Sequence, residues 1–274
     1  MAIKFVDRVP TRPGRIKITP ENGSAPWYGV MERADEPSVV GTPINAANLN
    51  AIQQNQGMSA NMTVYVTTSG SDSLGDGSRT APYATITKAL SVIPKQLNGN
   101  QAIINIASGT YPEAITISGF SGGTLTFTGV EGESVSVLTI VISNVDDVVF
   151  SNLNYNVIGG NSVTFAIHVT GSQVRVLSSF HVSNAVTTGV YALLRTTIYF
   201  MNLTVSEVGN AVAASNGATL VVANISGSAK EVGFRAIGGG VICFTNNTMS
   251  APTMYVTSGG GRIYSGAQTN IPNY

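Results

Sequence analysis

The chain has 274 residues, with 14 basic and 14 acidic side chains, and 10% of its residues are charged, against about 25% in ordinary soluble domains. This zero balance argues against nucleic acid or an anionic membrane surface as a partner, and the apolar content of 43% argues against disorder. No apolar run reaches the ~18 residues of a membrane helix, so we expect no membrane insertion. The single cysteine, Cys243, excludes an intrachain disulfide and argues against a cysteine-based metal site.

The N-terminal part of the chain differs from the rest in charge. Residues 1–60 carry six basic and five acidic side chains, whereas residues 151–274 carry five and two. The shift predicts a small charged N-terminal segment, 1–60, followed by a long neutral body, 61–274. The first eight residues contain no apolar stretch of the signal-peptide kind, so we expect synthesis in the cytoplasm without export.

The beginning of the body, at about residues 78–97, has the pattern of a capping helix. Apolar residues there follow the i, i+3, i+4, i+7 spacing of one helix face. Thr85 is placed to cap the start of the helix and Pro94 to end it. The apolar stripe consists of Ile86, Ala89, Leu90 and Ile93.

A repeat with a period of about 22 residues runs through positions 103–270. Each period contains an apolar anchor strand, with Phe or Val two places after its first residue and Asn or Ser four places after it. A second apolar strand begins about eight places before each anchor, and Gly or Asn turns separate the two strands. The anchor strands begin at Ile103, Leu125, Val148, Val174, Ile198, Leu220, Ile242 and Ile263.

The repeat predicts the fold class. Neither strand buries its own apolar face, so successive periods must stack, with equivalent residues ~4.8 Å apart. Phe then packs on Phe, and the Asn amides form a hydrogen-bonded ladder. The expected column consists of Asn152, Ser178, Asn202, Asn224 and Asn246. The sequence therefore predicts an all-β parallel β-helix of about 22-residue coils with a short capping helix.

The second strands carry two adjacent columns that are both mostly apolar. Successive residues of a strand point to opposite faces, so one of these columns faces outward, where a lone solenoid would be polar. We infer that identical shafts pack side by side as a homotrimer; a monomer with an apolar ridge is the alternative. The expected interface residues are Val141, Ile167, Tyr191, Val212 and Val256.

Acidic side chains are too sparse to predict a catalytic site. Hydrolases of glycans need two carboxylates about 5–9 Å apart. After residue 150 the chain has only Glu207 and Glu231, which lie about one coil apart in expected loops, with Lys230 available to pair locally. Asp146 and Asp147 precede an anchor strand as turn residues. We therefore expect no catalytic residues.

The sequence also predicts no metal site and no cofactor. Asp72 and Asp76 lie in a Gly- and Ser-rich loop but lack a further acidic ligand for Ca²⁺. His168 is expected to be packed and hydrogen-bonded in a second strand, and His181 to lie in a loop. No phosphate-binding or metalloprotease motif occurs.

A sugar-binding surface is the remaining candidate for a site. Glycan sites combine aromatic rings with Arg or Asn side chains. Arg175, Tyr191, Arg195 and Tyr199 fall on neighbouring coils of the predicted shaft, and we take them as the glycan-binding candidates.

Several segments resemble known families. Residues 64–72 (VYVTTSGSD), 75–86 (GDGSRTAPYATI) and 103–111 (IINIASGTY) resemble the start of pectate-lyase-like right-handed β-helix proteins. Residues 5–10 (FVDRVP), 13–15 (PGR), 33–37 (RADEP) and 41–45 (GTPIN) resemble the leader of tail and baseplate proteins from phages of Gram-positive anaerobes. The first resemblance implies that the β-helix is right-handed.

The second resemblance implies a role in a virion. Residues 1–60 would attach the chain to phage tail or baseplate proteins, and the β-helix would project as a noncatalytic spike or fibre that contacts host cell-surface polysaccharide. A glycan-active lyase or hydrolase is one alternative, and a purely structural baseplate component is another.

Overall fold

The computed structural model describes residues 15–18, 27–30, 57–159 and 164–266. The chain divides into two compact units, Met1–Gln56 and Gly57–Tyr274. In the first unit, β1 (Arg15–Ile18) pairs antiparallel with β2 (Trp27–Val30). The remainder of the predicted attachment segment up to residue 56 lies outside the described residues.

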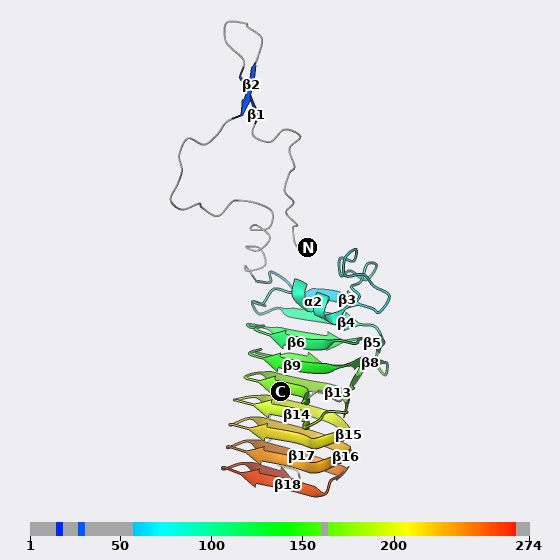
Figure 1. The fold of residues 1–274 in the computed structure, drawn as a ribbon, viewed down its shortest axis with the longest axis vertical. Helices are drawn as coiled ribbons and strands as arrows, with labels where there is room; N and C mark the ends of the chain where they lie inside the picture. The colour runs from blue at the N-terminus through cyan, green and yellow to red at the C-terminus, as the bar shows by residue number, and fades with distance from the viewer. Residues whose placement is uncertain (1–14, 19–26, 31–56, 160–163, 267–274) are drawn as a thin grey trace. The chain divides into compact units, whose positions relative to one another are not determined.

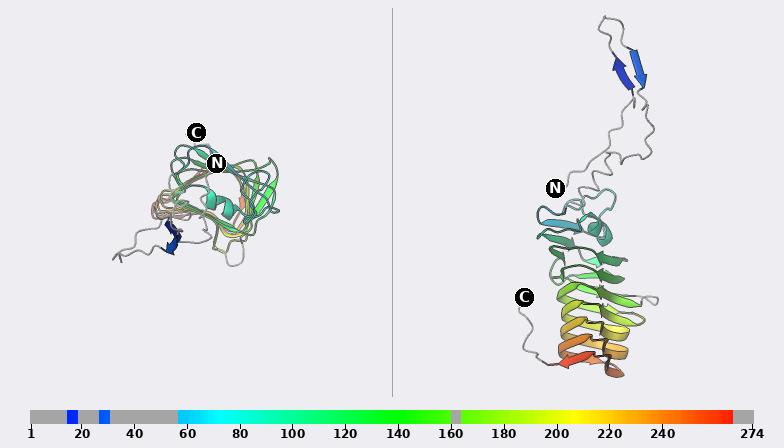
Figure 2. Two further views of the ribbon diagram at one scale, coloured as in Figure 1. Left: turned by 90° about the horizontal axis from the view of Figure 1, so that it is seen from above. Right: turned by 90° about the vertical axis from the view of Figure 1, so that its left-hand side faces the viewer.

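The second unit is an all-β parallel β-solenoid of about seven turns, consistent with the right-handed β-helix that the sequence predicts. Its rungs stack one upon another from β3 to β18 (Figure 1). Seen from above, successive rungs follow the same outline around a common interior (Figure 2). Every strand pairing between rungs is parallel within the described part of this unit.

The helix α2 (Ile86–Val92) covers the N-terminal end of the stack (Figure 2). The Thr85 hydroxyl accepts a hydrogen bond from the Lys88 amide at 3.1 Å, as expected for an N-cap. The Glu113 carboxylate accepts bonds from the Ile86 and Thr87 amides, both at 2.9 Å, which satisfies two further donors of the first turn. The predicted apolar stripe is buried against the first rungs.

Each complete coil has three strands rather than two. We name the three faces that these strands build the second face, the anchor face and the third face, in the order in which the chain follows them. The second face consists of β6 (Ala114–Ser118), β9 (Thr139–Ser143), β12 (Phe165–Thr170), β14 (Thr188–Leu193), the ends of β15 (Thr197–Ser215) and β16 (Thr219–Ile237), and β18 (Thr253–Ser258).

The other two faces share several long strands. The anchor face consists of β3 (Met62–Val66), β4 (Gln101–Ile106), β7 (Thr124–Thr128), β10 (Val148–Phe150), the starts of β13 (Gln173–Ser183), β15, β16 and β17 (Val241–Ser250), and β19 (Arg262–Ser265). The third face consists of β5 (Gly109–Thr110), β8 (Ser134–Val137), β11 (Asn154–Val157), and the later parts of β13, β15, β16 and β17.

Inward columns of apolar side chains form the core. Leu125, Val148, Val174, Ile198, Leu220, Ile242 and Ile263 pair in register, which confirms seven of the eight predicted anchors. Phe127 stacks on Phe150 with ring centroids 4.9 Å apart, and Phe150 meets Phe180 of the next coil edge to face. Such aromatic pairs contribute about 0.5–1.5 kcal/mol beyond the burial of their area.

Two predicted positions are shifted by one residue. In the first coil, Ala102 pairs with Leu125 and Ile104 with Phe127, so the anchor there is Ala102 and not Ile103. After Val176 the register changes, and Ser179 rather than Ser178 pairs with Asn202. The bulge at this point turns Ser178 into the interior.

Two corners flank each anchor strand. At the first corner, between the second face and the anchor face, every coil has at least one residue with a φ between 49° and 68°. The first such residue in each coil is Gly119, Asn144, Gly171, Leu194, Asn216, Gly238 or Gly259, and Leu194 is followed by Arg195 at 52°. At the asparagine corner, between the anchor face and the third face, the Asn224 amide donates to Asn202 Oδ1 at 2.9 Å, and the Asn246 amide donates to Asn224 Oδ1 at 2.7 Å. The predicted asparagine ladder is therefore confirmed for these three residues, whereas the Asn152 amide donates to the Thr128 hydroxyl at 3.1 Å.

Candidate binding surfaces

The third face carries polar side chains on its outer side along its whole described length. Its strands alternate in most rungs: residues such as Phe180, Leu203 and Ile225 point inward and are buried, and their neighbours point outward. In the later rungs Gly227 and Asn247 take inward positions and are not buried. One outward column, in paired order, is Thr110, Ser136, Asn156, His181, Thr204, Ser226 and Thr248. Sequence reasoning missed this face, and it placed His181 in a loop although His181 lies in β13.

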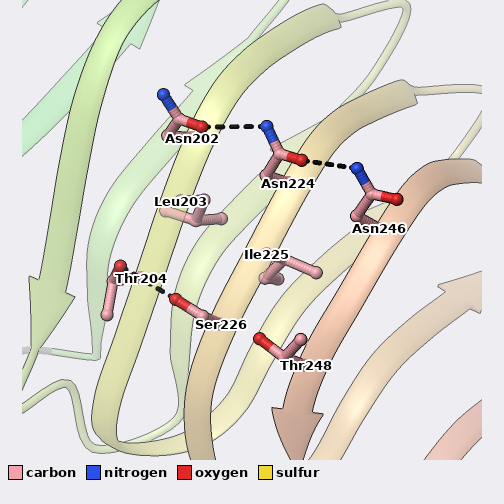
Figure 3. Close-up of a pocket in the computed structure, with 8 residues that line it drawn as sticks. All are labelled: Asn202, Leu203, Thr204, Asn224, Ile225, Ser226, Asn246 and Thr248. Carbon is pink, nitrogen blue, oxygen red and sulfur yellow. Dashed lines mark hydrogen bonds between the residues drawn. The ribbon is translucent and has the colours of Figure 1, made fainter.

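A groove of about 380 Å³ runs over three rungs of the third face (Figure 3). On one side it is lined by the asparagine ladder. On the other side lie Thr204 and Ser226, whose hydroxyls are 3.1 Å apart, and Thr248 of the next rung. Because the side chains of Leu203 and Ile225 point inward, the backbone of these two residues forms the floor of the groove between the two polar columns. No charged side chain lines the groove.

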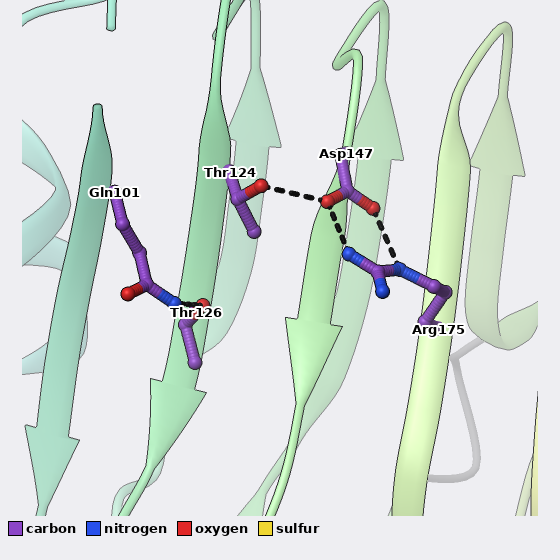
Figure 4. Close-up of polar contacts among 5 residues, drawn as sticks. All are labelled: Gln101, Thr124, Thr126, Asp147 and Arg175. Carbon is purple, nitrogen blue, oxygen red and sulfur yellow. Dashed lines mark hydrogen bonds and ion pairs between the residues drawn. The ribbon is translucent and has the colours of Figure 1, made fainter. Parts of the chain in front are cut away.

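Arg175 and Tyr199, two of the glycan-binding candidates, are paired neighbours on the outer side of the anchor face. The Arg175 guanidinium binds the Asp147 carboxylate of the preceding rung at two points, Nε to Oδ1 at 3.0 Å and Nη2 to Oδ2 at 2.5 Å (Figure 4). The Thr124 hydroxyl donates to the same carboxylate at 2.8 Å. The hydrogen bond with Asp147 raises the pKa of Arg175. Arg175 thus ties adjacent rungs together.

Tyr191, the third candidate, lies on a different face. It pairs with His168 and Ala213 on the outer side of the second face. Its ring stacks on Phe165 with centroids 4.8 Å apart, and its hydroxyl lies 2.9 Å from the Ser215 hydroxyl. The structure therefore does not bring Tyr191 into contact with Arg175 or Tyr199 through any strand pairing.

Arg195, the fourth candidate, occupies the first corner. It is exposed and has a φ of 52°, next to Leu194, whose φ is 49°. In the following coils the same two positions are filled by Asn216-Gly217 and then by glycine pairs. Arg195 is thus held in a left-handed conformation that glycine and asparagine adopt at lower cost.

The expected interface column is partly wrong. Ile167 and Val212 are 3% and 0% exposed, because they pair with Ile140, Val190 and Phe234 in an inward column. Loops of unequal length shift the register by one residue in these two coils, and such a shift moves a side chain to the other face. The outward column of the second face is Thr116, Val141, His168, Tyr191, Ala213, Arg235 and Val256.

His168 is packed as expected, but without the expected hydrogen bond. Its ring packs against both Phe165 and Tyr191, with centroid distances of 5.2 Å and 5.5 Å, and these two rings also stack on each other. Its Nε2 atom is buried and has no hydrogen-bond partner among the described residues. Burial lowers the pKa of His168, so the neutral form is favoured in this cluster.

The acidic residues considered as catalytic candidates bind other parts of the fold. Glu207 forms an exposed ion pair with Lys230 of the next coil at 2.8 Å, so Lys230 bridges two coils and does not pair with its neighbour Glu231. Asp146 accepts a hydrogen bond from the Gly122 amide at 2.7 Å. These contacts connect neighbouring coils.

The loop aspartates are also structural. Asp72 accepts hydrogen bonds from the Ala84 and Thr85 amides and from the Thr85 hydroxyl, at 2.7–3.1 Å. Burial on its own raises the pKa of Asp72, but the Thr85 hydroxyl and the two amides outweigh it, and the net pKa is lowered. Asp76 accepts a bond from the Ser78 amide at 2.9 Å. Both carboxylates therefore shape the loop before α2.

The part of the chain that the structure describes also bears on metal binding and on membrane insertion. No group of three or more His, Cys, Asp or Glu side chains there is arranged to hold a metal ion. Among the same residues, no helix is both long enough and apolar enough to cross a bilayer.

Comparison with known proteins gives one match. A family described as "Protein of unknown function (DUF1565)" matches residues 68–119, and this family is associated with β-helix proteins. The matched segment covers the loop before α2, the helix itself and the first rungs. No curated protein and no solved structure matches the chain.

Proposed function

We propose that the chain is a noncatalytic structural protein of a phage or prophage tail. In this proposal the solenoid forms a short trimeric spike or fibre that contacts the host surface, and residues 1–60 attach it to the tail or baseplate. The noncatalytic part of the proposal rests on the contacts of the acidic side chains, which bind other parts of the fold. Asp146, Asp147 and Glu207 bind groups of neighbouring rungs, and Asp72 and Glu113 hold α2.

The tail location is supported by the leader segments, 5–10 and 33–45, which are similar to those of tail and baseplate proteins. Antibodies against the solenoid should label the tails of particles released from the producing cells, as seen by electron microscopy. Labelling confined to cells or to free protein would contradict the location.

The homotrimer is supported by the outer side of the second face. Val141, His168 and Tyr191 are half-buried and form three successive apolar or aromatic positions of the outward column, where a lone solenoid would present polar side chains. Light scattering on a sizing column should give a mass near three times 28.4 kDa. Val141→Lys should lower this mass, because it places a charge in the apolar column.

A matched control separates the interface from a general effect of charge. Ser136→Lys introduces the same group on the outer side of the third face and should leave the trimer intact. A wild-type chain that elutes as a monomer, or a Val141→Lys variant that stays trimeric, would rule out this interface.

The noncatalytic role is tested by incubating the full chain with host cells and host polysaccharide. We expect binding to cells without release of reducing ends or unsaturated sugars. Release of either product would instead establish a hydrolase or a lyase. Failure to bind any host cell would favour a purely structural baseplate component.

A further inference from the structure

We propose that the groove on the third face binds a neutral, extended polysaccharide, with its sugar units following the rungs of the solenoid. This inference rests on the proposed function, because it names the site and the ligand class for contact with the host surface. The site differs from the four residues that the sequence singled out, which lie on the anchor face, on the second face and at the first corner.

The first argument is the chemistry of the groove lining. Asn202, Asn224 and Asn246 supply amides along one side, and Thr204, Ser226 and Thr248 supply hydroxyls along the other (Figure 3). Each hydroxyl has one donor and two acceptor sites, so the bond between Thr204 and Ser226 leaves hydrogen-bonding capacity toward the groove. Sugar hydroxyls likewise both donate and accept, and they match such a surface.

The second argument is charge. No Lys, Arg, Asp or Glu side chain lines the groove, although an exposed ion pair, Glu207 with Lys230, lies on the same coils. A nucleic acid or an anionic glycan needs basic side chains to replace its counterions, and an apolar peptide needs apolar pockets for its anchors. A neutral glycan needs neither.

The third argument is periodicity. Rungs of a β-solenoid repeat every ~4.8 Å, which is close to the length of one sugar unit in an extended glycan. The pairs Asn202 and Thr204, Asn224 and Ser226, and Asn246 and Thr248 repeat on three successive rungs. A linear polymer lying along the groove therefore meets one asparagine amide and one Thr or Ser hydroxyl on each rung.

The groove has no aromatic lining, so one groove holds the glycan by hydrogen bonds that replace bonds to water. Such exchange contributes little per bond. Useful affinity then depends on several rungs per chain and on several chains per particle, because linked weak sites act together.

The experiment uses the full chain in native gels that contain one polysaccharide each. The neutral probes are β-1,4-glucan, β-1,3-glucan, galactan, mannan and dextran; the anionic probes are polygalacturonate and hyaluronan. We expect at least one neutral probe to slow the chain and the anionic probes to have no effect. Thr204→Trp, which fills the groove, should abolish the shift.

Thr197→Trp is the matched control, since Thr197 is an exposed threonine of the same strand on the anchor face, and it should keep the shift. Thr248→Lys is a second groove variant in case Thr204→Trp does not fold, as judged by circular dichroism. A shift that survives in a folded Thr204→Trp or Thr248→Lys variant would overturn the groove as the site.

The remaining outcomes separate this inference from the proposed function. Binding to the anionic probes alone, or to no probe, would overturn a neutral glycan as the ligand. The chain would still be a host-contacting protein if it binds host cells in the assay described above. If the chain binds neither the polysaccharide probes nor host cells, the proposed contact with the host surface is overturned as well.

Discussion

The two corners that flank the anchor strand turn the chain by different physical means. The first corner depends on the backbone, because at least one residue in each coil must adopt a left-handed φ, which glycine and asparagine do at low cost. The asparagine corner depends on side chains, because Asn202, Asn224 and Asn246 bond to each other from rung to rung. The first corner therefore favours glycine or asparagine because of their backbone freedom. The asparagine corner favours asparagine because its side-chain amide can both donate and accept a hydrogen bond.

The largest expected loss of stability comes from adding a Cβ atom at the first corner, where neighbouring backbone leaves no room for it. A Cβ atom at Gly240 would collide with the carbonyl oxygen of Ala214 in the preceding rung. Gly240→Ala should lower the free energy of unfolding by about 1–3 kcal/mol, since backbone must shift, as measured by urea denaturation. Gly217→Ala is the control: its Cβ meets nothing within 4 Å, and its φ of 77° should cost about 1 kcal/mol. A larger loss at Gly217 would contradict the steric explanation.

The next effect is a gain in stability at the same corner. Leu194 and Arg195 hold two successive left-handed conformations without glycine or asparagine. Replacing them together by Asn and Gly, the pair found one coil later at Asn216-Gly217, should stabilise the chain by about 1–2 kcal/mol. A rise in the thermal midpoint would show this. Leu194→Ala keeps the strained backbone and should give no gain; an equal gain there would point to the exposed Leu side chain instead.

A smaller effect is expected at the asparagine corner. The Asn224 amide donates to Asn202 Oδ1 and to the Met201 carbonyl oxygen, and its own oxygen accepts from Asn246. Asn224→Ala should cost about 0.5–1.5 kcal/mol, because the position is exposed and water replaces part of the lost bonding. Thr245→Ala, an exposed change near the same corner, should cost less. Equal losses in the two variants would show that the ladder adds nothing to stability.

The smallest expected effect concerns His168, which lies in a strand of the second face and not at a corner. This effect depends on pH. Burial lowers the pKa of His168, so the unfolded state binds a proton more tightly than the folded state does. The stabilisation by the neutral ring is therefore complete above pH ~6.5 and is lost as the pH falls through the lowered pKa. The thermal midpoint of the wild type should fall more between about pH 8 and pH 5 than that of His168→Phe. Parallel slopes for the two proteins would contradict this.

Repetition made the anchor face predictable. Seven anchors and the Phe column could be located from residue type alone, because an interior column needs an apolar residue once per coil. The N-cap Thr85 and the apolar stripe of α2 were predictable for a similar reason, since helix start signals are local.

The second face shows where residue type fails. Ala166 and Ile167 are both apolar, as are Ala211 and Val212, so either member of each pair fits an inward column. Strand pairing decides in favour of Ile167 and Val212. The choice depends on the length of the loop before each strand, which a fixed period does not describe.

The third face had a signal that a search for apolar runs overlooks. Residues 134–137 (SVSV), 154–157 (NYNV) and 202–205 (NLTV) alternate polar and apolar residues, which is the pattern of a strand with one buried face. Counting this alternation would have located the third strand of each coil and, with it, the polar column beside the groove.

The sequence by itself determined the solenoid, its capping helix and the asparagine ladder, because a repeated column of similar side chains has one low-energy arrangement when coils stack. Only the tertiary structure decided which side chains are available to a ligand. Arg175 is held by Asp147, Ile167 and Val212 face the core, and the polar third face is left uncovered. The physical reason is that burial of a side chain depends on its register with the coil before and after it, and register is set by loops whose lengths differ from coil to coil.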